Sequence, residues 1–233
     1  ISIAGGDPLL YPDILEIVAD IKRRGLKPII NTNGKALTME LLKDLKKAGV
    51  YGFTFHVDSK QGRGNEWKGK NEIELLDLRL QYAQMLAEVG GISCSFNSTV
   101  YEDNLQYVPE MINWAHKHID IVHTMVFICF RHVIPNMPFD WYAGGTKVEW
   151  DKIMYHSDKK RDVEILSTDV LAKVRERFPD FTPSAYLNGT VKADSFKWLI
   201  TERVGTKDTI YGYLGPKFME LMMTVHHFFK GTY

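Results

Sequence analysis

Cysteine is scarce in this sequence, which has only Cys94 and Cys129 among its 233 residues. Two cysteines are too few for the disulfide framework of a small secreted protein. Both lie in apolar, β-branched segments. The sequence therefore favours ordinary core residues over metal ligands or redox groups at these two positions.

Net charge and long apolar runs are also lacking. Lys plus Arg is 29 and Asp plus Glu is 29, so no overall field attracts nucleic acid or an anionic membrane. No segment approaches the roughly 18 uninterrupted apolar residues that cross a bilayer, and no charged and then apolar leader precedes Ile1. These absences predict a globular, cytoplasmic protein without nucleic-acid or membrane partners.

The first residues, Ile1-Ser2-Ile3-Ala4, have the composition of a strand already under way. We therefore interpret the sequence as part of a longer chain. What is present is 45% hydrophobic. That content is enough to fill the core of one large α/β domain or two small ones.

Short β-branched runs alternate with longer amphipathic segments up to Arg131. The predicted strands are 1–4, 27–31, 51–57, 92–100 and 121–131. The predicted helices between them are 13–24, 38–49, 72–89 and 103–118. This βαβ order is typical of a parallel sheet.

The alternation stops after Arg131, so residues 132–233 are predicted to form a C-terminal extension. Its predicted helices are 168–178 and 215–230. Aromatic residues beside glycines at 141–145 and 186–190 indicate loops on the substrate side.

Polar or glycine-rich residues lie at or just beyond the carboxyl end of every predicted strand of the first part. Because the carboxyl ends of parallel strands meet at one edge, where ligands bind, these residues are the candidates for a site. They are Gly5, Gly6, Asp7, Pro8, Thr32, Asn33, Gly34, His56, Asp58, Asn97, Thr99 and Arg131.

The first of these segments is the most distinctive. Gly5 and Gly6 free the backbone to take positive φ, and Asp7 adds a carboxylate beside the exposed carbonyls. Such a site suits an ammonium group, and an ordinary tight turn is the competing interpretation. Farther along, His56 and Asp58 alternate on a strand and share the inner face if Phe53 and Phe55 point outward.

Other polar residues have two interpretations each. Gln61, Arg63 and Asn65 can bind a carboxylate or phosphate of a substrate, or belong to a solvated loop. His226 and His227 are adjacent, about 100° apart on a helix, and cannot chelate one metal ion as an i, i+4 pair does. Three nearby methionines are interpreted as core packing; they are Met219, Met222 and Met223.

Taken together, four of the segments resemble the motifs of radical S-adenosylmethionine (SAM) enzymes. Gly5-Gly6-Asp7-Pro8 resembles "GGEP", with Asp7 in place of glutamate. Thr32-Asn33-Gly34 resembles "TNG". His56-Val57-Asp58 is similar to "S-x-D", with His56 in place of serine, and Asn97-Ser98-Thr99-Val100 resembles "N-x-T-V". The four occur in the family's order and spacing over residues 1–131.

The resemblance implies a fold and a cofactor. The fold is a partial parallel (β/α)6 barrel of the radical SAM type, in which residues 1–131 supply strands 2 to 6 and the first strand is missing. The cofactor is SAM, whose amino group is bound by the Gly5–Pro8 segment and whose ribose and carboxylate are bound by the later strand ends.

The resemblance also implies a reaction. A [4Fe-4S] cluster, held by a C-x3-C-x2-C loop expected before Ile1, is reduced by a protein such as flavodoxin or ferredoxin. It cleaves SAM to a 5′-deoxyadenosyl radical, which takes a hydrogen atom from a small-molecule or peptide substrate. Without that loop, residues 1–233 are expected not to assemble the cluster and to be inactive by themselves.

Three alternatives remain open. A radical SAM methyltransferase is the second choice within the family. A degenerate barrel that binds SAM or another nucleotide without cleaving it belongs to a different functional class. An ordinary α/β barrel enzyme acting on a phosphorylated metabolite would need a Gly-rich phosphate loop after the late strands, and the sequence has no convincing one.

Overall fold

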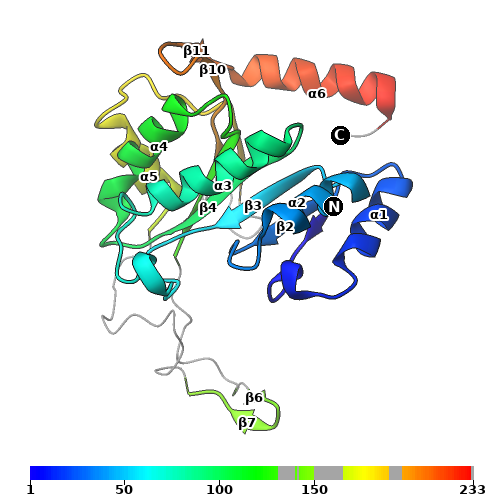
Figure 1. Cartoon of the computed structure of the whole chain (residues 1–233). Coiled ribbons are helices and arrows are strands. Elements are labelled where there is room, and N and C mark those ends of the chain that lie inside the picture. The colour runs from blue at the N-terminus through cyan, green and yellow to red at the C-terminus, as the bar shows by residue number, and fades with distance from the viewer. Residues whose placement is uncertain (131–139, 141, 150–164, 189–195, 232–233) are drawn as a thin grey trace.

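The structure is a computed structural model that describes residues 1–130, 140, 142–149, 165–188 and 196–231. Five parallel strands form its main sheet (Figure 1). They are β1 (Ser2–Ile3), β2 (Ile29–Thr32), β3 (Gly52–His56), β4 (Ser93–Val100) and β5 (Thr124–Cys129).

The strands lie in the order β1-β2-β3-β4-β5, so each is hydrogen-bonded to its neighbour in the chain. A (β/α) barrel has this order, whereas a doubly wound sheet reverses direction at a switch point. The prediction of an α/β fold built as a partial parallel barrel is confirmed.

Four helices connect the strands: α1 (Ile14–Arg23), α2 (Met39–Ala48), α3 (Leu76–Val89) and α4 (Val108–Lys117). Short 3-10 turns precede three of them: η1 (Pro8–Leu10), η2 (Asn65–Trp67) and η3 (Leu105–Tyr107). Helix α2 begins and ends as the sequence predicts. The Thr38 hydroxyl accepts from the Leu41 amide at 3.1 Å, and Gly49 takes a φ of 98° at the other end.

Helix α3 begins four residues later than the sequence predicts. The side chain of Asn71 accepts hydrogen bonds from the amides of Ile73 and Glu74 at 2.9 and 3.0 Å. These local bonds hold the segment in a turn instead of a helix, which asparagine favours over a helix interior. Glu72 is buried within this turn.

The main core lies between the sheet and its helices. Phe55 stacks on Tyr82 of α3 with ring centroids 4.6 Å apart, and Phe96 meets Trp114 of α4 at 5.8 Å. Phe53 and Phe55 are buried on this side, so the condition under which His56 and Asp58 share the inner face is met. Cys94 is fully buried in the same core, and this burial raises the pKa of its thiol to about 12.

The described segments after β5 form antiparallel pairs and two helices. The pairs are β6 (Tyr142–Ala143) with β7 (Thr146–Lys147), β8 (Ala185–Asn188) with β9 (Phe196–Ile200), and β10 (Arg203–Gly205) with β11 (Ile210–Tyr213). The helices are α5 (Ser167–Arg175) and α6 (Pro216–Lys230). The two predicted helices of this region are present as α5 and α6, and the division of the chain at residue 131 stays a prediction.

Helices α5 and α6 differ in how they pack. Helix α5 buries Val174 in a second core cluster with Val100 and Val108. Helix α6 has no buried residue, and Met222 and Met223 are 49% and 50% exposed. The interpretation of these methionines as core packing is wrong, because a periodic apolar stripe does not specify which element covers it. Figure 1 shows α6 at the top, apart from the layers of the sheet. Among the described helices, none has the length and apolar character needed to cross a membrane.

Candidate functional site

The candidate residues after β1, β2, β3 and β4 lie along one edge of the sheet. Parallel pairing places Thr32 beside Phe55 and His56 beside Asn97. The segment from Gly5 to Pro8 joins this edge through side-chain contacts with Thr32 and Asn33. We call the set at this edge the polar rim: Gly5, Gly6, Asp7, Thr32, Asn33, His56, Asp58, Asn97 and Thr99.

Asp7 connects the first two strand ends of the polar rim. The Thr32 hydroxyl donates to its carboxylate at 2.8 Å, and the Asn33 amide donates at 3.0 Å. A third donor, the Leu9 amide at 3.1 Å, makes Asp7 the N-cap of η1, in which Pro8 is buried. The carboxylate therefore points toward β2, a connection that the sequence did not reveal. None of the described lysines and arginines forms an ion pair with Asp7, so its negative charge is not cancelled.

The backbone before Asp7 is open. Gly5 and Gly6 take φ values of 103° and 58°, and a Cβ placed on either would meet no atom within 4 Å. The prediction of positive φ is confirmed. A bare, left-handed segment of this kind exposes its peptide groups to a ligand.

The Thr32-Asn33-Gly34 segment forms a tight turn whose side chains bond within the chain. The Thr32 hydroxyl accepts from the Gly34 amide at 3.0 Å, and the Asn33 side chain accepts from the Lys35 amide at 2.8 Å. Gly34 has a φ of 78°, and a Cβ there would lie 2.5 Å from the Tyr82 ring. Only glycine fits this position, for a packing reason that the sequence does not show.

His56 at the end of β3 and Asp58 two residues later point to the same side and meet there, as the alternation of an extended segment predicts. His56 Nε2 lies 2.7 Å from Asp58 Oδ2 and 3.2 Å from the Thr99 hydroxyl of β4. Asp58 is buried, and this burial raises its pKa. The hydrogen bond and charge of His56, with smaller contributions from Thr99 and the Lys60 amide, outweigh the burial, so the pKa of Asp58 lies below its ordinary value. The side chain of Asp58 is therefore a carboxylate at neutral pH.

Asn97 has the least satisfied side chain of the polar rim. Its Oδ1 is buried and has no hydrogen-bond partner in the structure. Buried polar atoms are paired in most native proteins, so an unpaired acceptor calls for an explanation. A bound ligand with an N–H or O–H donor would supply the missing bond.

Arg63 does not have the role proposed for it from the sequence. Its Nη2 donates to the backbone carbonyls of Asn33 and His56 at 2.8 and 2.9 Å and to the Gln61 side chain at 2.9 Å. The residue is 7% exposed, so it is neither in a solvated loop nor extended toward an external anion. Arg63 instead ties the end of β2 to the end of β3. Asn65 lies in η2 with a φ of 55°.

Sequence reasoning missed a buried ion pair behind the polar rim. Arg79 Nη2 lies 2.6 Å from Glu72 Oε2, with side chains 0% and 1% exposed. A signal was available, because Arg79 stands three residues after Leu76 and three before Tyr82, on the apolar face of α3. A charged residue in such a stripe indicates a buried partner.

The remaining candidates are Arg131 and the two cysteines. Arg131 lies outside the described residues. Cys94 faces the core from β4 and Cys129 lies on β5. No group of three or more His, Cys, Asp or Glu able to hold a metal ion occurs in the part of the chain that the structure describes.

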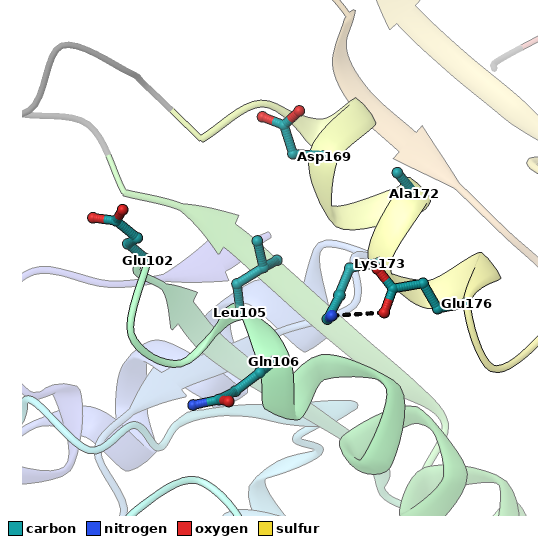
Figure 2. Close-up of a pocket in the computed structure, with 7 residues that line it drawn as sticks. All are labelled: Glu102, Leu105, Gln106, Asp169, Ala172, Lys173 and Glu176. Carbon is teal, nitrogen blue, oxygen red and sulfur yellow. Dashed lines mark hydrogen bonds and ion pairs between the residues drawn. The ribbon is translucent and has the colours of Figure 1, made fainter.

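A groove of about 400 Å³ lies between η3 and α5. Figure 2 shows the residues that line it. Its lining residues are Glu102, Leu105, Gln106, Asp169, Ala172, Lys173 and Glu176. Lys173 of α5 pairs with Glu176, the residue directly after that helix, at 2.6 Å. Since no residue of the polar rim lines this groove, we assign it no part in the site.

Known proteins resemble this chain over part of its length. The sequence model of the radical SAM superfamily matches residues 1–115. The AdoMet-dependent heme synthase of Methanosarcina barkeri is 38% identical over 169 residues, which are 71% of this chain and 46% of that protein. The Fe-coproporphyrin III synthase of the same organism is 24% identical, over 64% of this chain and 34% of that protein.

A third relative, the PqqA peptide cyclase of Gluconobacter oxydans, is 26% identical over 54% of this chain and 36% of that protein. The chain thus spans less than half the length of each of these relatives. Among solved structures, Streptococcus suis SuiB aligns with a TM-score of 0.46 at 17% identity, covering 77% of this chain and 35% of SuiB.

Proposed function

Because the chain belongs to the radical SAM superfamily, we propose that its polar rim binds SAM in an enzyme that cleaves SAM reductively and modifies an organic substrate. One observation carries this proposal: the polar ends of four successive parallel strands gather at a single edge. Ligands of parallel α/β proteins bind at this edge.

The polar rim fits the chemistry of SAM in two places. The open peptide groups of Gly5 and Gly6, next to the uncancelled charge of Asp7, suit the ammonium group of the methionyl moiety. The unpaired acceptor of Asn97 suits a ribose hydroxyl. Pro8 and Gly34 support the backbone of the site, and Arg131 is assigned to it by the resemblance alone.

The residues of the rim would act by binding and orienting SAM. Asp58, held as a carboxylate by its bond to His56, would add negative charge to the site, and its own side chain is fully buried. His56 and Thr99 fix the direction of that carboxylate. Because side chains of β3 and β4 hold each other, the site needs little rearrangement when the ligand arrives.

The cysteines of this chain do not fit the cluster. Cys94 is fully buried among apolar side chains, and burial raises its thiol pKa to about 12, whereas a ligand must be a thiolate. Cys129 alone cannot hold a cluster. In the family, a bound [4Fe-4S] cluster supplies the electron that cleaves SAM, and we assign no part of that electron transfer to residues 1–233.

We also propose a substrate class and an electron source. The related proteins include a heme synthase and peptide cyclases, which supports a small organic molecule or a peptide as substrate. A small electron-transfer protein such as flavodoxin or ferredoxin would be the reductant, in a cytoplasmic setting. A methyltransferase has no observation in its favour here.

The proposal is tested with the full-length protein, including any residues encoded before Ile1. The protein is loaded with iron and sulfide anaerobically and mixed with SAM and dithionite. We expect 5′-deoxyadenosine to form, as detected by liquid chromatography with mass spectrometry. Cluster-loaded protein that forms none contradicts the catalytic part of the proposal.

A second candidate function is a SAM-binding barrel that does not cleave its ligand. Its support is the polar rim alone, because the contacts described above require only that SAM binds. Isothermal titration calorimetry separates the two candidates. SAM that binds without forming 5′-deoxyadenosine, in protein that contains no cluster after reconstitution, supports the second candidate.

A further inference from the structure

The buried ion pair of Glu72 and Arg79 has no part in the proposed contacts with SAM. Both side chains are almost completely buried, on the helix side of the sheet. Burying two charges is costly, and apolar residues of similar size often stabilise a protein equally well. A gain in stability is therefore a weak explanation for this ion pair. Its hydrogen bonds to other parts of the chain suggest a different role.

On one side, the pair holds the backbone around Asp58. Arg79 Nη2 donates to the carbonyl of Val57 at 2.7 Å. Glu72 Oε1 accepts from the amide of Ser59 at 2.8 Å. Val57 and Ser59 flank Asp58. The hydrogen bonds from Arg79 and Glu72 therefore hold the peptide groups on both sides of Asp58.

On the other side, the carboxylate of Glu72 also holds the end of β4. The Ser98 hydroxyl donates to Glu72 Oε2 at 3.2 Å. The Asn104 side chain donates to Glu72 Oε1 at 3.3 Å and to the carbonyl of Thr99 at 2.9 Å. Ser98 stands between Asn97 and Thr99 on the strand. Glu72 therefore links the strand end that carries Asp58 to the strand end that carries Asn97.

We propose that Glu72 and Arg79 are positioning residues, which set the spacing between Asp58, just after β3, and the Asn97-Thr99 segment on β4 and thereby determine the affinity for SAM. Neither residue touches the ligand. In a strand, the backbone on either side of a residue determines where its side chain points. This inference rests on the proposed function of the polar rim.

The decisive variant is the double substitution Glu72→Leu with Arg79→Met in the full-length protein. It removes both charges and keeps similar volume, so the variant should fold. We expect its dissociation constant for SAM to rise at least about tenfold, because small misplacements of binding groups have large effects. The measurements are isothermal titration calorimetry with SAM and the midpoint of thermal unfolding.

Two comparisons separate positioning from a loss of stability. Leu86→Ala removes a side chain from the core face of α3, away from the polar rim, and should lower the unfolding midpoint without changing SAM affinity. Ser98→Ala removes the direct hydrogen bond between Glu72 and β4, together with a 3.5 Å contact of Arg79, and leaves the ion pair in place. It should fold normally and weaken SAM binding, which keeps the inference testable if the double variant does not fold.

Each outcome has a defined meaning. If the wild-type protein binds SAM and the folded double variant or Ser98→Ala binds it within about twofold of the wild type, the positioning role is refuted and the proposed function stands. If Leu86→Ala weakens binding as much as the double variant does, the effect is one of stability and the positioning role is also refuted. If the wild-type protein itself does not bind SAM, the proposed function fails.

Discussion

Asp58 illustrates at the residue scale how a strand end acquires a stable charge. Its carboxylate is buried, which by itself raises its pKa, yet it accepts hydrogen bonds from His56 and the Lys60 amide at 2.7 and 3.0 Å. The net effect lowers the pKa of Asp58. A lowered pKa in the folded state means that the ionised carboxylate stabilises the fold.

This stabilisation has a definite pH dependence. It is fully present above the unfolded pKa of an aspartate, about 4, and is lost as the pH falls through the lower folded pKa. We expect Asp58→Asn to lower the free energy of unfolding at pH 7 by about 1.5–3 kcal/mol, the usual contribution of hydrogen bonds to a charged group. Urea unfolding of the wild type and the variant from pH 7 to pH 3 should show that their difference in free energy of unfolding shrinks below pH 4. A difference that stays constant over this range would refute the lowered pKa of Asp58.

Gly34 illustrates a residue whose identity is required by packing. It takes a φ of 78°, and a Cβ would lie 2.5 Å from the Tyr82 ring. Gly25 offers a matched control, because it takes a φ of 76° and has no atom within 4 Å of a Cβ.

We expect Gly25→Ala to cost about 1 kcal/mol for backbone strain alone. Gly34→Ala should cost about 2–4 kcal/mol, since an overpacking term is added to the same strain. The measurement is the free energy of unfolding in urea. Equal losses for the two variants would show that Tyr82 moves aside without cost.

At the scale of elements, the ends of helices were predictable where one side chain determines them. Threonine and aspartate are both common N-cap residues, and Asp13 and Thr38 stand directly before α1 and α2. In the structure the Thr38 hydroxyl accepts from the Leu41 amide, whereas the Asp13 side chain makes no capping bond. Residue type predicts a cap only when the local backbone lets the side chain reach the free amides.

The two caps therefore predict different effects of substitution. Thr38→Ala should destabilise the protein by about 1 kcal/mol, the usual value for a lost N-cap bond. Asp13→Ala should change stability by less than about 0.5 kcal/mol. Chemical unfolding of the two single variants makes the comparison. An equal loss at both positions would mean that Asp13 caps α1 in solution.

The alternation along β3 was also predictable, and it placed His56 and Asp58 correctly on one face. The start of α3 was not, because the side chain of Asn71 and the burial of Glu72 hold residues that helical periodicity would include. Periodicity reports which residues are apolar on one face, but it does not report hydrogen bonds that compete with the helix.

At the scale of the whole molecule, α6 is a helix that contributes no buried side chain to the main core. It has no buried residue, and Phe228 and Phe229 are 81% and 74% exposed. By contrast, Phe55 is fully buried in the main core. The free energy of folding should therefore depend on Phe55 and hardly at all on the two exposed rings.

Substitution tests this division. Phe228→Ser with Phe229→Ser should change the free energy of unfolding by less than about 0.5 kcal/mol. Phe55→Ala should cost about 3–5 kcal/mol, the usual range for a buried phenylalanine. Thermal and urea unfolding measure both effects. A large loss from the α6 variant would show that its rings are buried in solution.

The sequence by itself determined the order of strands and helices, the polar composition of each strand end and the positive φ of Gly5 and Gly6. These features depend on residues close together in the chain, where periodicity and backbone freedom act. Only the tertiary structure decided that Asp7 bonds to Thr32, that Arg63 joins Asn33 to His56, and that Glu72 and Arg79 lie behind Asp58. Except for the short reach from Arg63 to His56, these contacts join side chains and peptide groups from different elements. Composition cannot specify such contacts, because they depend on how the elements pack.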